Sequence, residues 1–128
     1  MEINLDLDLP VIETDPTCVR EALRNILDNS LKFTPRGGRI SLTAAFRGGR
    51  VEMVISDTGR GIEEEELPHI FEKYYVGRRG SGSGTGLGLF IAKEMVDTLG
   101  GTIAVSSRAG EGTSVMVSIA LAETDERM

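Results

Sequence analysis

The sequence predicts an α/β domain, a two-layer sandwich in which helices cover one face of a five-stranded sheet. Five segments alternate apolar and polar residues as half-buried strands do, and two others carry apolar residues at helical spacing. Half-buried strands need one covering layer, and two helices can supply it. The 128 residues suit a single domain, so one domain spanning residues 1–128 is predicted.

The first elements are a strand and a long helix. Alternation from Ile3 to Leu9 predicts the strand. Asp15 followed by Pro16 is typical of a helix start, because the aspartate can cap free amides and proline is tolerated in the first turn. The helix is expected to end at Phe33, before Thr34-Pro35. Its predicted apolar face comprises Val19, Ala22, Leu23, Ile26, Leu27 and Leu31.

The remaining elements are a hairpin, a helix and a second pair of strands. Alternating residues 39–47 and 51–57 flank Gly48-Gly49, which indicates a tight turn. A helix with apolar residues around much of its circumference is predicted from about Gly86 to Leu99, and Gly100-Gly101 stops it. Two further strands follow, around 103–105 and 115–121. The tail 122–128 is expected to fray.

Composition excludes several classes of protein. The net charge of −6 argues against a nucleic-acid binder. The lone Cys18 cannot form an internal disulfide and suits a reducing compartment. No apolar run reaches the roughly 20 residues that span a bilayer, and the acidic N-terminus lacks signal-peptide character. We therefore expect a cytoplasmic domain without direct membrane contact.

Asn25, Asn29 and Lys32 form a polar stripe on the first helix. They fall within about 60° of one another around the helix axis, beside its apolar face. Amide oxygens can bind Mg²⁺ beside phosphate and water, and Lys32 supplies charge opposite to phosphate. The stripe therefore predicts a metal–phosphate site, although a solvated helix face would look the same.

Two glycine-rich segments extend this pattern. Asp57 ends a strand before Thr58-Gly59-Arg60-Gly61, which is compatible with plain turn chemistry or with a carboxylate that accepts from a nucleobase amine. The run GSGSGTGLGL at 80–89 lacks the lysine of a P-loop, but glycines opening a helix suit phosphate or a flexible linker. Residues 72–86 lack periodicity and predict a mobile loop. In it Arg78 and Arg79 form either a solvated pair or a phosphate clamp.

Together these segments resemble the ATP-binding catalytic domain of sensor histidine kinases, in the superfamily that includes gyrase, Hsp90 and MutL. The resemblance covers Asp15 to Leu121. It rests on five motifs that match the family's asparagine box, first glycine box, phenylalanine box, second glycine box and closing strand: NILDNSLKFTP, DTGRGI, IFEKYY, GTGLGLFIAKEMV and GEGTSVMVSIAL. It implies a Bergerat-type fold with a mixed sheet, ATP and Mg²⁺ as cofactors, and a lid at 72–86.

The resemblance also implies roles for single residues. Asn25, Asn29 and Lys32 would form the catalytic group, with Asn29 holding Mg²⁺, and Asp57 would bind adenine. Phe71 would anchor the lid, and Arg78 or Arg79 could reach the terminal phosphates. The other residues implied to bind nucleotide are Phe33, Gly59, Gly61, Ile62, Gly84, Thr85, Gly86, Leu87, Gly88, Leu89 and Thr113.

One position separates branches of the superfamily. ATP-hydrolysing relatives usually carry a glutamate base where this chain has Asn25, and an amide cannot take a proton, which favours a kinase. The accepting histidine would lie on a dimerisation hairpin with an HExRTPL-like motif, which this chain lacks, and a response-regulator receiver domain would act downstream. The chain is thus expected to be one domain of a larger kinase. Alternatives are an anti-sigma-type serine kinase and a non-catalytic nucleotide-sensing module.

Overall fold

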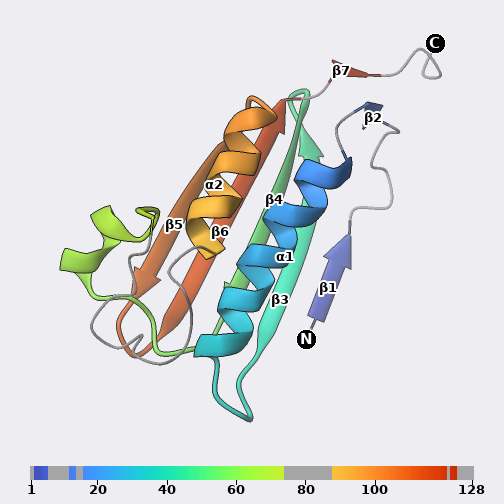
Figure 1. Ribbon diagram of the computed structural model, residues 1–128. Helices are drawn as coiled ribbons and strands as arrows, with labels where there is room; N and C mark the ends of the chain where they lie inside the picture. Colours follow the sequence, from blue (N-terminus) through green and yellow to red (C-terminus); the bar gives the residue numbers. More distant parts are fainter. Residues whose placement is uncertain (1, 6–11, 14–15, 74–87, 121, 124–128) are drawn as a thin grey trace.

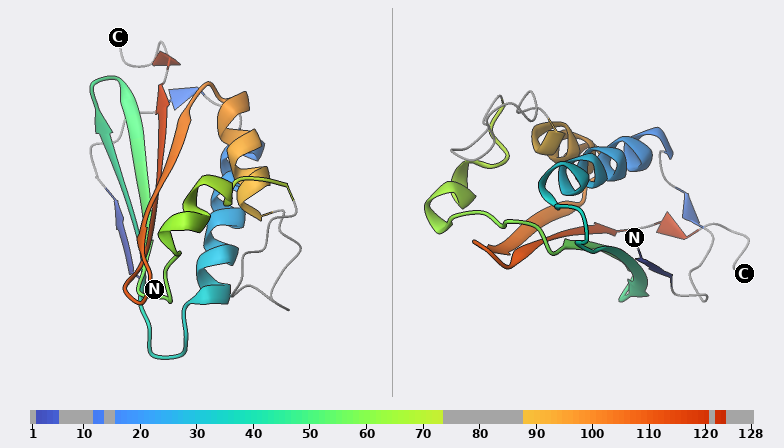
Figure 2. Two further views of the ribbon diagram at one scale, coloured as in Figure 1. Left: turned by 90° about the vertical axis from the view of Figure 1, so that its left-hand side faces the viewer. Right: turned by 90° about the horizontal axis from the view of Figure 1, so that it is seen from below.

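The structure, a computed structural model, describes residues 2–5, 12–13, 16–73, 88–120 and 122–123. Two helices, α1 (Pro16–Phe33) and α2 (Gly88–Thr98), pack side by side over one face of a twisted sheet (Figures 1 and 2). The predicted α/β class is confirmed. The first helix begins and ends where the sequence predicts, whereas residues 86 and 87 of the second predicted helix lie outside the described residues.

The main sheet has the strand order β1-β3-β4-β6-β5. Strands β3, β4, β6 and β5 pair antiparallel, and β1 pairs parallel with β3. The bounds are β1 (Glu2–Leu5), β3 (Ile40–Arg47), β4 (Arg50–Asp57), β5 (Thr102–Arg108) and β6 (Gly112–Ala120). The β3–β4 hairpin turns at Gly48 and Gly49, whose φ angles of 57° and 79° favour glycine.

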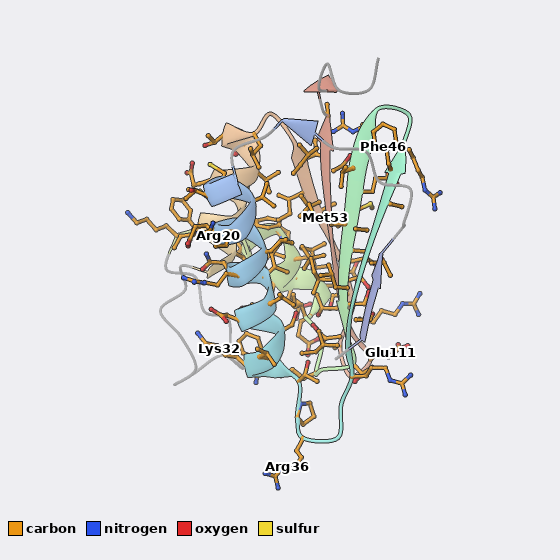
Figure 3. The ribbon with its side chains drawn as sticks, turned by 90° about the vertical axis from the view of Figure 1, so that its right-hand side faces the viewer. Arg20, Lys32, Arg36, Phe46, Met53 and Glu111 are labelled. Atoms are coloured by element: carbon orange, nitrogen blue, oxygen red, sulfur yellow. The ribbon has the colours of Figure 1, made fainter. Side chains whose placement is uncertain are left out.

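The hydrophobic core lies between the helices and the inner face of the sheet. Alternation places Val51, Met53 and Ile55 of β4 on that face, and all three are buried. Figure 3 shows Met53 between α1 and the sheet. The largest fully buried side chains come from both helices and the two central strands: Ile26, Ile55, Val96 and Val117.

Leu31 corrects the predicted apolar face of α1. It is 60% exposed, whereas Ser30 is only 3% exposed. On an α-helix, residue 30 lies about 40° from residue 26 and residue 31 about 140° away. Since Ile26 is fully buried, the face that meets the core ends in Ser30 and leaves Leu31 in solvent.

Three short elements were not predicted. The 3-10 helix η1 (Glu64–His69) follows the first glycine segment, and β2 (Ile12–Glu13) pairs antiparallel with β7 (Ala122–Glu123). Residues 122 and 123 are therefore not a frayed tail, because they bond to a segment more than a hundred positions earlier in the sequence. Residues 6–9 of the predicted first strand lie outside the described residues. Among the described helices, none has the length and apolar character needed to cross a membrane.

Candidate functional site

A row of polar side chains crosses the inner face of the sheet at one end. Ser107 of β5 is opposite Thr113 of β6, and Thr113 is opposite Asp57 of β4. Side chains directly opposite on antiparallel strands share a face, with their β-carbons about 5 Å apart. The row lies one alternation beyond buried Val115, so it borders the core instead of facing the open side of the sheet.

Asp57 shapes the loop that follows it. Its Oδ1 atom accepts a hydrogen bond of 2.8 Å from the backbone N–H of Gly59. The loop is also held to the start of β3, because the Thr58 N–H donates to the Arg39 carbonyl at 3.0 Å and the Arg39 N–H donates to Thr58 Oγ1 at 2.8 Å. The turn chemistry considered from the sequence is therefore present, and it occupies one carboxylate oxygen while leaving Oδ2 for a ligand.

The glycines around this row permit close approach between segments of the chain itself. A β-carbon on Gly59 would collide with the Phe33 carbonyl oxygen, and one on Gly61 would collide with the Arg108 carbonyl. Gly61 and Gly112 also have positive φ angles of 72° and 130°. These glycines let three parts of the backbone come into contact beside the polar row, because no side chains stand between them.

Asn25, in the polar stripe of α1, lies beside the start of α2. The Asn25 amide nitrogen donates to the Glu21 carbonyl at 2.7 Å, so the amide oxygen of Asn25 is not used in this bond. That oxygen lies 4.0 Å from where a β-carbon of Gly88, the first residue of α2, would stand. Asn29 is half-buried, whereas Lys32 is exposed and points away from the sheet (Figure 3).

Phe33 and Arg60 join the end of α1 to the first glycine segment. The Arg60 guanidinium carbon lies 4.4 Å from the centre of the Phe33 ring, and the Arg60 N–H donates to the Phe33 carbonyl at 3.4 Å. The Arg60 carbonyl in turn accepts from the Gly110 N–H at 2.6 Å. The stacked cation was not predicted from the sequence, because it depends on the loop folding back over α1.

Other predicted site residues contribute apolar surface. Leu89 is buried, and Ile62 and Phe71 pack against the core. Phe71 also lines a cavity of about 290 Å³ between the end of η1 and α2, whose wall includes Phe90 and Lys93 but not Asp57 or Thr113. Arg78, Arg79, Gly84, Thr85, Gly86 and Leu87 lie outside the described residues.

Sequence reasoning missed Ser107, which accepts from the Ile62 N–H at 2.8 Å and donates to the Gly112 carbonyl at 2.9 Å. The alternation pattern of the sequence did contain a signal for this residue. Alternation places residue 107 on the same face as Ile103 and Val105, so a serine occupies a position that the pattern reserves for an inward side chain.

The oxygen donors near α1 fit Mg²⁺ bound together with a nucleotide. Within the described residues no group of three or more His, Cys, Asp or Glu side chains could hold a metal ion. Asn25 directs a neutral amide oxygen toward the start of α2, and Asn29 lies one turn further along. Mg²⁺ commonly takes one or two protein oxygens and completes its shell with phosphate and water, so this donor set suits a metal–phosphate complex and not an all-protein cage.

Comparison with known families matches residues 14–123 to the model described as histidine kinase-, DNA gyrase B- and HSP90-like ATPase. Among curated proteins, the chain is 37% identical to the histidine protein kinase DivJ of Caulobacter vibrioides over 83% of the chain. It is 39% identical to the adaptive-response sensory kinase SasA of Synechococcus elongatus over 84% of the chain. The chain spans only 18% and 28% of the lengths of these two relatives.

Solved structures agree in fold. Full-length ShkA in complex with AMPPNP superposes with a TM-score of 0.80 and 32% identity, over 96% of this chain and 26% of that one. The mycobacterial sensor histidine kinase MprB gives a TM-score of 0.80 and 28% identity, over 96% of this chain and 85% of that one. The likeness therefore extends over almost the whole of the chain.

Proposed function

Because the chain belongs to the family of histidine kinase-, DNA gyrase B- and HSP90-like ATPases, we propose that it is the Mg·ATP-binding catalytic domain of a two-component sensor histidine kinase. In this proposal it delivers the γ-phosphate of ATP to a histidine on a dimerisation hairpin, and a response-regulator receiver domain acts downstream. The fold is of the Bergerat type with a mixed five-stranded sheet, and the domain works on the cytoplasmic side. The kinase names of the relatives and the AMPPNP complex of ShkA support this proposal.

One observation carries the proposal: Asn25, in the amide stripe of α1, lies beside the N-terminus of α2. Asn25 presents its oxygen beside Gly88, the first residue of α2. The first backbone N–H groups of a helix and the positive end of its dipole attract phosphate. Asp57, at the end of β4, supplies an acceptor for the adenine amine. A nucleotide between these two ends would place its base at the sheet and its phosphates between the helices.

The residues suit phosphoryl transfer better than hydrolysis. Transfer of a γ-phosphoryl group depends mainly on positioning and charge neutralisation. Bound Mg²⁺ would neutralise phosphate charge, with Asn29 as its protein ligand, and Lys32 would add a positive charge near the same helix. Asn25 carries an amide with no basic atom, so it can orient water or metal but cannot deprotonate an attacking water. The nucleotide would therefore be held for an acceptor.

The proposal is tested by following the phosphoryl group. In the full-length parent kinase, Mg·ATP labelled at the γ-position should give an acid-labile, base-stable phosphohistidine on the dimerisation hairpin. The chain alone should bind Mg·ATP, turn it over slowly at most, and acquire no label on His69, which is exposed at the end of η1. Label on His69, or serine phosphorylation of an added anti-sigma antagonist, would contradict the proposal.

Replacing Asn29 by alanine should uncouple Mg²⁺ from nucleotide binding. Mg²⁺ uses few protein ligands, so loss of one amide oxygen should reduce the Mg²⁺-dependent gain in ATP affinity by about 10-fold or more. Titration calorimetry with ATP in Mg²⁺ and in EDTA measures that gain. Asp28→Ala, at the exposed neighbouring position, is the matched control and should keep it. An unchanged Mg²⁺ dependence of ATP binding in Asn29→Ala would mean that Asn29 is not a ligand of the metal.

A further inference from the structure

The hydroxyl group of Ser107 uses its one proton and both of its lone pairs in hydrogen bonds within the protein. Its oxygen accepts from the Ile62 N–H at 2.8 Å, and its proton is donated to the Gly112 carbonyl at 2.9 Å. A third contact of 2.8 Å joins Ser107 Oγ to Thr113 Oγ1. A serine hydroxyl has one proton and two lone pairs, so these three bonds complete its capacity.

The direction of the third bond follows from the other two. A carbonyl oxygen can only accept, so the Gly112 contact takes the single Ser107 proton. The bond between the two hydroxyls must then use the proton of Thr113. With that proton directed toward β5, Thr113 Oγ1 retains only lone pairs for anything that binds beside it.

Thr113 is directly opposite Asp57, whose Oδ1 is already bonded to the Gly59 N–H. The site therefore offers two neighbouring acceptors to a ligand, Oδ2 of Asp57 and Oγ1 of Thr113, and neither has a proton to donate when the carboxylate is ionised. A primary amine on a nucleobase has two N–H donors and matches this pair. A carbonyl in the same place would face lone pairs alone.

We propose that Ser107 is a positioning residue for base selection, which holds the Thr113 hydroxyl as an obligate acceptor so that the site accepts the 6-amino group of adenine and rejects a 6-carbonyl. This role rests on the proposed nucleotide-binding function. Ser107 acts through Thr113 and is not itself in contact with the base. Without Ser107, the Thr113 hydroxyl is free to rotate and donate to a carbonyl.

The test compares ATP with inosine triphosphate, which carries a carbonyl where adenine has its amine. Affinities of both are measured by calorimetry with Mg²⁺ for the unmodified chain and for Ser107→Ala. We expect the preference for ATP to fall by about 3- to 10-fold in Ser107→Ala, the range for one hydrogen bond between neutral groups. Ser106→Ala, an exposed serine on the other face of the same strand, should leave the preference unchanged.

A purely structural role for Ser107 would weaken both nucleotides equally and leave their ratio unchanged. Coupling to Thr113 gives a second readout: in a Thr113→Val background, adding Ser107→Ala should no longer change the preference. If Ser107→Ala does not fold, the test uses the single variant Thr113→Val and its affinities for ATP and inosine triphosphate. It should weaken ATP and spare inosine triphosphate, whereas equal weakening of both would mean that Thr113 also donates and would overturn the proposal.

Failure of this inference is distinguishable from failure of the proposed function. If the unmodified chain binds neither nucleotide, the assignment as an ATP-binding domain is wrong, and the inference falls with it. If the unmodified chain prefers ATP but Ser107→Ala keeps the same ratio, the domain assignment stands and only the positioning role is wrong.

Discussion

Replacing Asp57 by alanine should weaken ATP binding about 10- to 150-fold. A buried hydrogen bond to a charged group contributes roughly 1.5 to 3 kcal/mol, and this range of affinity follows from it. The carboxylate is half-buried at the end of β4, with Oδ2 left unbonded by the loop. Calorimetry with Mg·ATP and Mg·GTP measures the effect. Equal affinity of the unmodified chain for the two nucleotides would contradict the assignment of Asp57 to the base.

Asp57→Asn is a sharper variant, because it keeps the shape of the side chain. The amide oxygen can still accept from the Gly59 N–H, which directs the NH₂ group toward the base. The site then presents a donor in place of an acceptor. We expect ATP to bind about as weakly as in Asp57→Ala, and GTP to bind more tightly than it does to the unmodified chain.

Gly112→Ala should destabilise the domain by about 3 to 5 kcal/mol. Gly112 has φ of 130°, and a β-carbon there would collide with the Asp57 carbonyl oxygen across the β4–β6 pair. Backbone strain of this kind costs about 1 to 3 kcal/mol and overpacking adds a similar amount, so the two together span about 2 to 6 kcal/mol, and we expect a value near the middle of that range. For a domain of this size the melting temperature should fall by about 10 °C or more. Thermal unfolding followed by circular dichroism measures the shift.

Gly49→Ala is the matched control for the collision. Gly49 also has a positive φ, 79°, but a β-carbon there meets nothing within 4 Å. It should therefore show the strain alone, about 1 to 2 kcal/mol. If Gly112→Ala were no worse than Gly49→Ala, the backbone at the start of β6 would have to shift easily, and Asp57 could not be held as rigidly as the proposed site requires.

Local patterns in the sequence were enough to predict most of the framework. Alternation identified β3 and β4 as a hairpin and placed Met53 and Ile55 inward, because side chains on a strand change face at every residue. The Asp-Pro pair and Thr34-Pro35 bracketed α1, since proline is tolerated at a helix start and disfavours helix in the residue before it. Asp57 and the α1 stripe were identified as candidate ligands because their chemistry is visible one residue at a time.

Contacts between distant segments could be decided only by the tertiary structure. The register of β4, β6 and β5 brings Asp57, Thr113 and Ser107 into one row, and no local pattern specifies which strands become neighbours. Packing of the helices sets Asn25 against Gly88 and selects Ser30 over Leu31 for the core, because the rotation of a helix about its axis is fixed by what it packs against. The sequence by itself thus determined the helices and strands and the candidate ligand-binding residues. The hydrogen-bond directions of those residues depend on neighbours up to several tens of residues away along the chain, and these directions decide which ligand groups the site can bind.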